Sequence, residues 1–355
     1  MTATLPTHAP GAPAAADAAP RPLLEVRDLA RRFTLRGGLF GRTREVRAVD
    51  GVSFAIHRGE TLALVGESGC GKSTVANLVM QLLAPSGGEI RIAGRPVQGT
   101  GGAREAWRHM QMVFQDPYAS LNPRMVAADM VAEPLVNYGI GTARHRSERA
   151  RALLDRVGLP AAMHGRYPHE FSGGQRQRLG IARALALEPS LIVADEPVSA
   201  LDVSVQAQIL NLLADLRREQ GVAYLFVSHD LGVVEYLADT VAVMYLGRIV
   251  ETAPRQAFFA QPRHPYARAL LDAVPTLDPR QRRTRDLLQG DVPSAASLPS
   301  GCRFRTRCPL AEPRCALHEP TPVSVAPRHL VACHVVADGA ATHRSPGTGH
   351  PLQET

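Results

Sequence analysis

The chain has 355 residues, of which 45% are hydrophobic and 21% charged, a composition typical of a soluble globular protein. It holds no run of 18 or more apolar residues, so we expect no part of this sequence to cross a membrane. Its formal net charge of +7 suits a nucleic acid, an anionic membrane or an arginine-rich solvated surface, and we favour the last interpretation.

The first predicted elements follow an N-terminus rich in Ala and Pro. Residues 1–21 lack a basic start with an apolar stretch behind it, so we predict a disordered tail rather than a secretion signal, and a cytoplasmic protein. Residues 23–29 and 51–56 have the pattern of short strands. Residues 61–65 form a compact apolar run, as a buried strand does.

A glycine-rich loop comes next and contains Lys72, the only lysine among the 40 lysines and arginines of the sequence. Its pattern, G-x-x-x-x-G-K-S, is that of a phosphate-binding loop. Apolar residues then recur at helical spacing from Val75 to Leu82, and Pro85 ends the pattern. A buried strand, this loop and a helix form the context that phosphate binding requires. The residues predicted to bind nucleotide here are Gly66, Glu67, Ser68, Gly69, Cys70, Gly71, Lys72, Ser73 and Thr74.

The chemistry of such a loop assigns roles to two of these side chains. Backbone N–H groups surround the phosphate oxygens, and the helix that follows adds its positive N-terminal end. Lys72 would neutralise the β- and γ-phosphates, and the Ser73 hydroxyl would ligate Mg²⁺. Because the guanidinium group of arginine is wide and planar, the lone lysine indicates a site that is too narrow for a guanidinium. The alternative is chance in an arginine-biased composition.

Farther along, the pattern of residues 125–185 is mostly helical, and we predict a helical insertion there. Residues 191–194 have the pattern of a second buried strand, which ends on Asp195 and Glu196. Asp195 would hold Mg²⁺ through water, and Glu196 would orient or deprotonate the attacking water. The alternative for two acids after a strand is a turn or the start of a helix.

The alternation of strands and helices continues beyond these acids. Apolar residues from Val205 to Leu216 mark one face of a helix that Gly221 closes. Residues 223–227 predict a third apolar strand, which ends at Ser228 and His229. Strands that alternate with helices indicate an α/β core with a parallel sheet.

The order and spacing of six motifs resemble those of the ABC ATPases over residues 22–262. Besides the phosphate loop and the Asp195-Glu196 pair, Gln115 resembles their Q-loop, Asp202 ends a D-loop-like stretch and His229 resembles their switch histidine. The remaining motif resembles the LSGGQ signature, with Phe in place of the first Leu; it is Phe171-Ser172-Gly173-Gly174-Gln175.

This resemblance implies an α/β P-loop ABC ATPase cassette, with a RecA-like core, an antiparallel β subdomain and a helical subdomain. It implies that Glu196, His229 and Gln115 are catalytic. Two such domains would pair head to tail, so that each ATP lies between one phosphate loop and the opposite signature. The nucleotide contacts implied outside the loop are Phe33 (adenine stacking, or else a core Phe), Asp195, Ser172, Gly173, Gly174, Gln175 and Asp202, and the Mg²⁺ ligands are Ser73, Gln115 and Asp195.

Further stretches resemble the ATPases of oligopeptide, dipeptide and nickel importers: residues 117–123, 264–266 and 301–309. The resemblance then spans residues 22–335, and the chain looks like the second ATPase of a pair. It implies a peripheral protein at the cytoplasmic face of the membrane. Its implied partners are a second, non-identical ATPase subunit rather than an identical one, two permeases and an extracytoplasmic substrate-binding protein, with no nucleic acid. The alternative is a soluble ABC ATPase acting on nucleic acid, although a single cassette without a coiled-coil insertion argues against the repair and ribosomal classes.

From residue 263 to 340 we predict a small appended domain, followed by a disordered tail at 341–355. It carries four cysteines, and a cytoplasmic chain is not expected to form disulfides. The four thiols suit a [4Fe–4S] cluster, which the importer resemblance favours, or Zn²⁺, or they are free and buried. These cysteines are Cys302, Cys308, Cys315 and Cys333, with His318, His329 and His334 as alternative ligands. Cys70, beside a helix N-terminus, is predicted to be a reactive thiol when nucleotide is absent.

Overall fold

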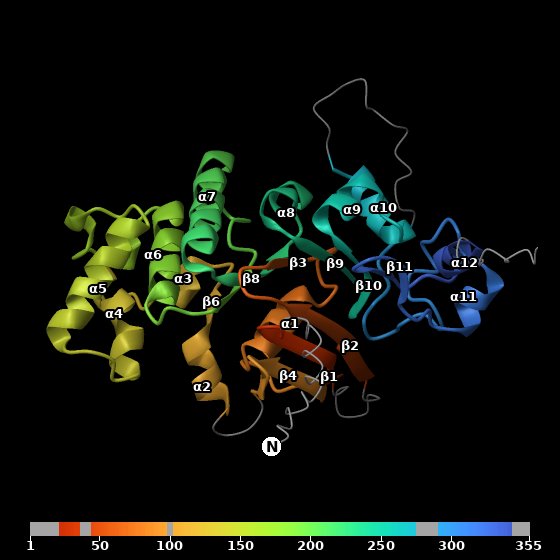
Figure 1. Cartoon of the computed structure of the whole chain (residues 1–355), viewed down its shortest axis with the longest axis horizontal. Helices are drawn as coiled ribbons and strands as arrows, with labels where there is room; N and C mark the ends of the chain where they lie inside the picture. Colours follow the sequence, from red (N-terminus) through yellow and green to blue (C-terminus); the bar gives the residue numbers. More distant parts are fainter. Residues whose placement is uncertain (1–20, 36–43, 98–101, 275–289, 343–355) are drawn as a thin grey trace, which may run out of the picture.

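The computed structural model describes residues 21–35, 44–97, 102–274 and 290–342. Two sheets lie at the centre of the molecule, and helices pack on both faces of the larger one (Figure 1). The predicted tails fall outside the described residues except at their inner edges, residue 21 and residues 341–342. Helix α12 ends within the second of these edges.

The smaller sheet is antiparallel, with the strand order β2-β1-β4-β5. Its first two strands are longer than the sequence pattern predicts, because cross-strand pairing continues outward to the pair Leu35–Arg44. The strands are β1 (Leu24–Leu35), β2 (Arg44–Ile56), β4 (Gly87–Ile92) and β5 (Arg95–Pro96). This sheet is the antiparallel β subdomain that the sequence predicts.

The larger sheet has the order β11-β12-β10-β9-β3-β8-β7-β6, and its pairings from β9 to β6 are parallel. The parallel strands are mostly apolar and, apart from one half-buried position in β6, buried, as expected when helices cover both faces. They are β3 (Thr61–Val65), β6 (Met110–Val113), β7 (Leu191–Asp195), β8 (Ala223–Ser228) and β9 (Thr240–Tyr245). The antiparallel edge consists of β10 (Arg248–Pro254), β11 (Val323–Ala326) and β12 (His329–Val331). The predicted α/β core with a parallel sheet is confirmed.

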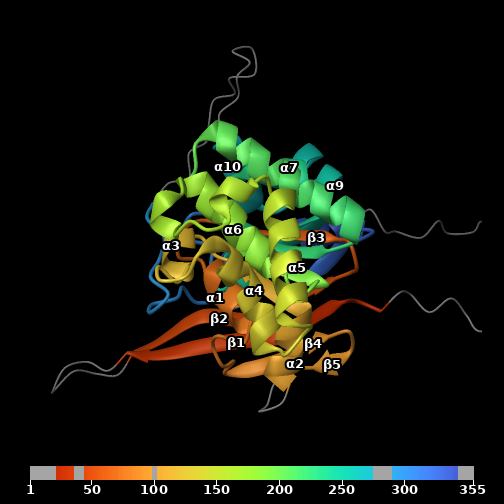
Figure 2. The same ribbon diagram turned by 90° about the vertical axis from the view of Figure 1, so that its left-hand side faces the viewer.

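The helices fall into three groups along the chain. Those of the cassette core are α1 (Lys72–Val79), α2 (Gly102–His109), α7 (Val203–Gln220), α8 (Leu231–Leu237) and α9 (Arg255–Ala260). Those between β6 and β7 are α3 (Pro117–Ser120), α4 (Ala127–Asn137), α5 (Ala143–Arg156) and α6 (Gly173–Leu185), with 3₁₀ turns at Ala161–Met163 and Pro168–Glu170. Figure 2 faces this helical part, where α4, α5 and α6 stand side by side. The C-terminal ones are α10 (Pro265–Asp272), α11 (Pro313–Leu317) and α12 (His334–Thr342).

The C-terminal region shares the sheet and the core of the cassette. Strand β12 pairs with β10, so the large sheet runs on without a break into this region. One buried cluster unites Val65 of β3 with Tyr245, Tyr266 and Phe304. The region thus adds strands to the sheet and side chains to its core, and the predicted domain boundary at residue 263 stays a prediction.

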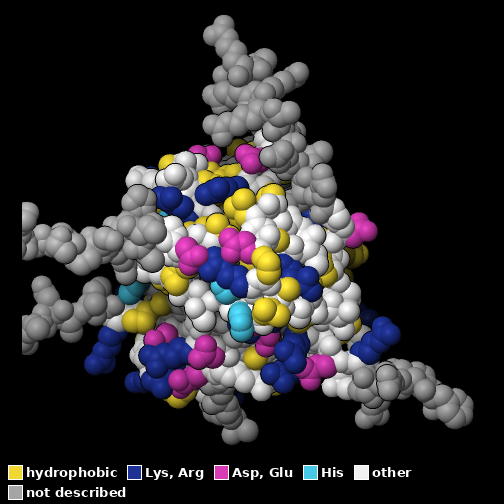
Figure 3. All heavy atoms as spheres, turned by 90° about the vertical axis from the view of Figure 1, so that its right-hand side faces the viewer, with side chains coloured by type: hydrophobic (Ala, Val, Ile, Leu, Met, Phe, Trp, Pro, Cys, Tyr) yellow, Lys and Arg dark blue, Asp and Glu magenta, His cyan; other side chains and the backbone are white. Residues whose placement is uncertain are grey.

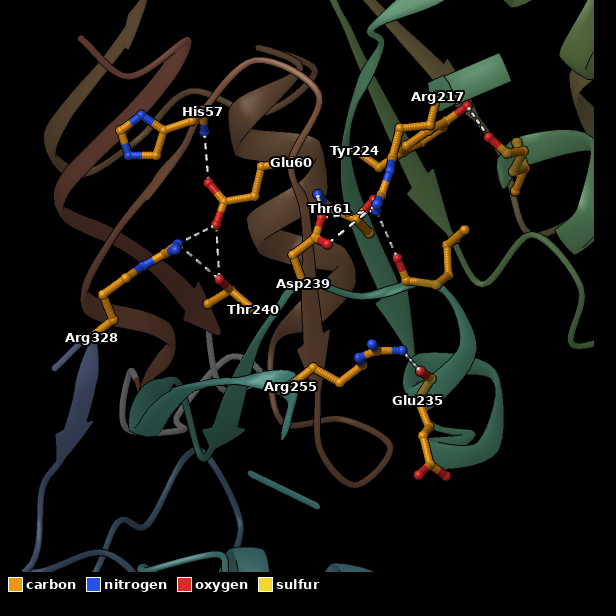
Figure 4. Close-up of polar contacts among 12 residues, drawn as sticks. His57, Glu60, Thr61, Arg217, Tyr224, Glu235, Asp239, Thr240, Arg255 and Arg328 are labelled. Atoms are coloured by element: carbon orange, nitrogen blue, oxygen red, sulfur yellow. Dashed lines mark hydrogen bonds and ion pairs between the residues drawn. The ribbon is translucent and has the colours of Figure 1, made fainter. Parts of the chain in front are cut away.

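The amino end of β3 lies in a network of polar side chains, drawn in Figure 4. Glu60 accepts hydrogen bonds from the His57 N–H (2.9 Å), the Thr240 hydroxyl (2.8 Å) and Arg328 (2.6 Å). Burial raises the pKa of Glu60, but these hydrogen bonds and the charge of Arg328 outweigh it and hold the pKa below its usual value. The carboxyl end of the same strand leads into the phosphate loop.

Candidate functional site

The phosphate loop joins the carboxyl end of β3 to α1 and is packed closely against neighbouring backbone. Gly66 has φ 152°, and a Cβ there would lie 2.2 Å from the Met244 carbonyl oxygen. Gly71 has φ 111°, and a Cβ there would lie 2.3 Å from the Ala48 carbonyl oxygen. Only glycine fits both positions. Gly71 caps α1 without a side-chain hydrogen bond, which leaves the first N–H groups of the helix for a ligand.

Lys72 is buried within this loop. Its ammonium donates hydrogen bonds to the carbonyl oxygens of Gly66 (2.7 Å) and Glu67 (3.0 Å). A compact ammonium can approach two carbonyls of one tight turn, whereas a planar guanidinium needs a wider space. The local geometry therefore agrees with the lysine that the sequence retains here.

Ser73 and Asp195 meet across the gap between α1 and β7. The Ser73 hydroxyl donates a hydrogen bond of 3.0 Å to Asp195 Oδ1. Burial raises the pKa of Asp195, and the hydrogen bond from Ser73 opposes that rise. A hydroxyl and a carboxylate at this spacing are hard oxygen ligands that fit Mg²⁺. These two residues would hold the ion, and it would supply positive charge beside the phosphates.

Glu196 has polar partners from two neighbouring strand ends. Gln115 Nε2 donates to Glu196 Oε2 at 3.1 Å, and His229 Nδ1 lies 3.1 Å from Glu196 Oε1. The three residues follow β6, β7 and β8, whose carboxyl ends share one edge of the sheet. Glu196 has φ 45°, a costly conformation for a residue with a side chain, and its N–H donates to the Val227 carbonyl (3.0 Å). The structure thus brings together all three predicted catalytic residues.

The signature residues lie apart from this cluster, at the start of α6 in the helical part (Figures 1 and 2). Ser172 and Gln175 form a capping box: the Ser172 hydroxyl accepts the Gln175 N–H (3.3 Å), and Gln175 Oε1 accepts the Ser172 N–H (3.0 Å). A Cβ on Gly174 would lie 2.3 Å from Val205 Cγ1, so glycine allows α6 to pack on α7. Asp202 caps α7 by accepting the Val205 N–H (3.0 Å). Their nucleotide contacts stay predictions.

Phe33 lies half-buried on β1, and the Arg31 guanidinium carbon sits 4.7 Å from the centre of its ring. This cation–π contact stabilises the ring on one side. Adenine stacking by Phe33 stays a prediction.

Sequence reasoning missed two side chains that contact the phosphate loop from the C-terminal region. The Glu67 N–H donates to the Tyr266 hydroxyl oxygen at 2.8 Å. The guanidinium of Arg307 donates to both carboxylate oxygens of Glu67, at 2.7 and 3.0 Å. Both residues lie in stretches that mark the importer resemblance, but nothing in their spacing indicates a contact with residue 67.

The prediction for Cys70 is wrong. Its thiol is buried under the loop, and burial raises its pKa despite the nearby charge of Lys72. The helix N-terminus alone does not make this thiol acidic, because desolvation of the thiolate is the larger effect.

The C-terminal cysteines converge without forming a ligand set. All four are free thiols, and burial, together with the proximity of the other three, raises the pKa of Cys302 to about 11. Within the described ranges, no group of three or more His, Cys, Asp or Glu side chains is placed to hold a metal ion. Nor are two of the alternative histidines free to do so, since His329 pairs with Glu251 (2.7 Å) and His334 with the His318 carbonyl (3.0 Å). As described, these residues do not fit a [4Fe–4S] cluster or Zn²⁺.

Comparison with known proteins places these features in a family. Residues 49–199 match the model of the ABC transporter family, and residues 250–315 match the oligopeptide/dipeptide transporter C-terminal region. A dimeric ATP-binding cassette in a post-hydrolysis state, bound to ADP and Pi, matches the fold with a TM-score of 0.58 and 29% identity, over 65% of this chain and 98% of that one. The fold and the site thus define an ABC ATPase.

Two curated relatives give the narrower placement. A probable peptide ABC transporter ATP-binding protein of Sinorhizobium fredii is 54% identical over 91% of this chain and 93% of its own length. An oligopeptide transport ATP-binding protein of Bacillus subtilis is 49% identical over 88% of this chain and 97% of its own length. The chain belongs to the ATP-binding proteins of peptide-type ABC transporters.

Proposed function

We propose that this chain hydrolyses ATP to power the import of peptides, or of a related small solute, across the cytoplasmic membrane. The observation that carries the proposal is Glu196, held by Gln115 and His229 beside the Ser73–Asp195 pair. The peptide-transport names of the relatives and the match to the transporter C-terminal region support the direction and the solute.

In this proposal Glu196 orients the attacking water and takes its proton. His229 and Gln115 fix the two carboxylate oxygens, so the carboxylate is in place before the nucleotide arrives. The loop N–H groups and Lys72 bind the β- and γ-phosphates, and Mg²⁺ on Ser73 and Asp195 would neutralise further charge. Within this chain's part of the site, the remaining requirement for hydrolysis is a water positioned in line with the γ-phosphate.

The proposed working unit is a pair of ATPase subunits, each supplying its signature to the other's ATP. Local caps hold Ser172, Gln175 and Asp202. Ser172 and Asp202 are exposed and Gln175 is half-buried, as surfaces that meet a second subunit must be accessible before assembly. We propose that the second subunit is non-identical and that both sit under two permeases fed by an extracytoplasmic binding protein.

The proposed location is the cytoplasmic face of the membrane, through contact with the permeases. None of the helices in the described part of the chain is long and apolar enough to span a bilayer. The nucleic-acid alternative has no support from the relatives. On the face that carries the C-terminal region, positive and negative side chains are interspersed (Figure 3), and this pattern offers no single-sign surface for a phosphate backbone.

For the four C-terminal cysteines, the described geometry supports free thiols over the predicted [4Fe–4S] cluster or zinc ion. Anaerobic purification followed by iron, sulfide and zinc analysis separates the three states. Iron and sulfide in equal amounts support the cluster, zinc alone supports the zinc ion, and neither metal leaves free thiols.

Purification from detergent-solubilised membranes tests the transporter assignment. We expect the chain to co-purify with two permeases, and ATPase activity to be insensitive to DNA and RNA. Recovery without permeases, together with activity stimulated by DNA or RNA, would favour the alternative.

A further inference from the structure

Glu67 places a negative charge inside a loop whose task is to bind anions. It is the only acidic residue among residues 66–74. Its carbonyl oxygen accepts a hydrogen bond from Lys72 (3.0 Å), so the same residue also helps to hold the ammonium. An unpaired carboxylate here would repel the phosphates of an incoming nucleotide.

Arg307 pairs with this carboxylate from 240 positions along the chain. The pair is bidentate, with one guanidinium nitrogen on each carboxylate oxygen (2.7 and 3.0 Å). The Arg307 side chain is 6% exposed and that of Glu67 27% exposed, so water screens the pair only in part. The cation comes from the C-terminal region and not from the cassette.

A second contact fixes the backbone of the same residue. The Glu67 N–H donates to the hydroxyl oxygen of Tyr266 (2.8 Å). The Tyr266 ring is fully buried, with ring centres 4.7 Å from Tyr245 and 5.4 Å from Phe304. The peptide group of Glu67 is therefore anchored to a rigid aromatic core rather than free to rotate.

The segment that carries Arg307 is itself fastened to the cassette. Arg303, four residues before Arg307, is buried and donates to the Asp50 carboxylate and to the Leu246 carbonyl. Gly247, the residue after Leu246, donates its N–H to the Cys70 carbonyl of the phosphate loop (2.8 Å). The loop and residues 303–307 thus rest on the same backbone, which keeps the guanidinium of Arg307 at Glu67.

We infer that Arg307 is a positioning residue for ATP: it neutralises Glu67 and, with Tyr266, holds the phosphate loop in its binding conformation. This inference rests on the proposed ATP site and extends it, because it makes the C-terminal region a part of nucleotide binding. Because Arg307 acts through its charge, removing the charge of Glu67 should restore the ATP binding that is lost when the charge of Arg307 is removed.

Equilibrium binding of a fluorescent Mg²⁺–ATP analogue to the full chain tests this, with thermal unfolding measured in parallel. We expect Arg307→Gln to weaken binding about tenfold. The double variant Glu67→Gln/Arg307→Gln should recover most of that loss, while its unfolding temperature stays below that of the wild type. Arg328→Gln, which removes a C-terminal arginine from the other end of β3, is the matched control and should bind like the wild type.

Unchanged binding by Arg307→Gln, or a double variant as weak as the single one, would overturn the inference and leave Arg307 a purely structural residue. If Arg307→Gln does not fold, Arg307→Lys keeps the charge without the bidentate pair and should weaken binding only about threefold; a tenfold loss there would contradict the role of charge. Failure of the wild type itself to bind the analogue would instead remove the proposed ATP site.

Discussion

Two arginines of the C-terminal region reach opposite ends of the same central strand, β3. At its amino end Arg328 contacts Glu60, and at its carboxyl end Arg307 contacts Glu67. The Arg328 side chain is 65% exposed, whereas that of Arg307 is 6% exposed. The arginine of the pair is therefore exposed at the amino end and buried at the carboxyl end, whereas the glutamates are 10% exposed (Glu60) and 27% exposed (Glu67).

The partners of the two glutamates differ as well. Glu60 keeps hydrogen bonds from His57 and Thr240 when Arg328 is removed (Figure 4), but the Glu67 carboxylate relies on Arg307 for its counter-charge. The C-terminal region is thus fastened to the sheet at one end of β3 and contacts the phosphate loop at the other. Variants at the carboxyl end of β3 should therefore affect ATP binding as well as stability, whereas variants at its amino end should affect stability alone.

The largest effect is expected from Glu196→Gln, at the edge of the sheet where the carboxyl ends of β3 and β7 lie. It removes the base while it preserves shape, so we expect ATP turnover to fall by roughly 10²-fold or more with ATP binding retained. The variant should also accumulate an ATP-bound pair of subunits, detectable by size-exclusion chromatography in the presence of the partner subunit. Phosphate release measures the first effect, and unchanged turnover would take Glu196 out of its role.

Lys72→Arg comes next. The substitution preserves the charge but puts a planar guanidinium where the Lys72 ammonium now donates to two carbonyl oxygens of one turn. We therefore expect the rate of hydrolysis to fall at least about tenfold. Phosphate release at saturating ATP checks this. Wild-type turnover in the arginine variant would show that the lone lysine is a compositional accident.

Stability should separate the two ion pairs. Loss of the protected pair in Arg307→Gln should lower the free energy of unfolding by about 2 kcal/mol. Loss of the exposed guanidinium in Arg328→Gln should cost only about 0.5 kcal/mol, because Glu60 would keep its hydrogen bonds from His57 and Thr240. Urea unfolding of both variants gives the comparison, and equal losses would erase the distinction between the two ends.

The smallest effect concerns pH at the amino end. Because the pKa of Glu60 in the folded protein is held below its usual value of 4.5, its ionised form stabilises the fold at neutral pH. That contribution is present above the unfolded-state pKa and is lost as pH falls through the folded-state pKa. Glu60→Gln should therefore flatten the fall in unfolding free energy below about pH 4.5. An equally steep fall in the variant would assign the acid sensitivity elsewhere.

The sequence predicted those parts of the fold whose signals are local. The run from Thr61 to Val65, the glycines behind it and the helical spacing after Lys72 lie within some twenty positions, and the structure has β3, the loop and α1 there. The grouping of Gln115 and His229 around Glu196 followed from the resemblance, which implies that all three residues are catalytic.

Long-range contacts escaped prediction for physical reasons. No periodicity links Arg307 to Glu67, and the short strands β11 and β12 carry too few apolar residues to indicate that they join the main sheet. The error at Cys70 has a different origin: its place before a helix was visible, but its burial was not.

Peptide uptake into proteoliposomes that contain the whole transporter is the most direct test of the central claim. With labelled peptide and binding protein outside and ATP inside, we expect uptake with the wild-type chain and none with Glu196→Gln, although both assemble with the permeases. Equal uptake with the two chains, or an assembled transporter that hydrolyses ATP without moving peptide or any related solute, would contradict it.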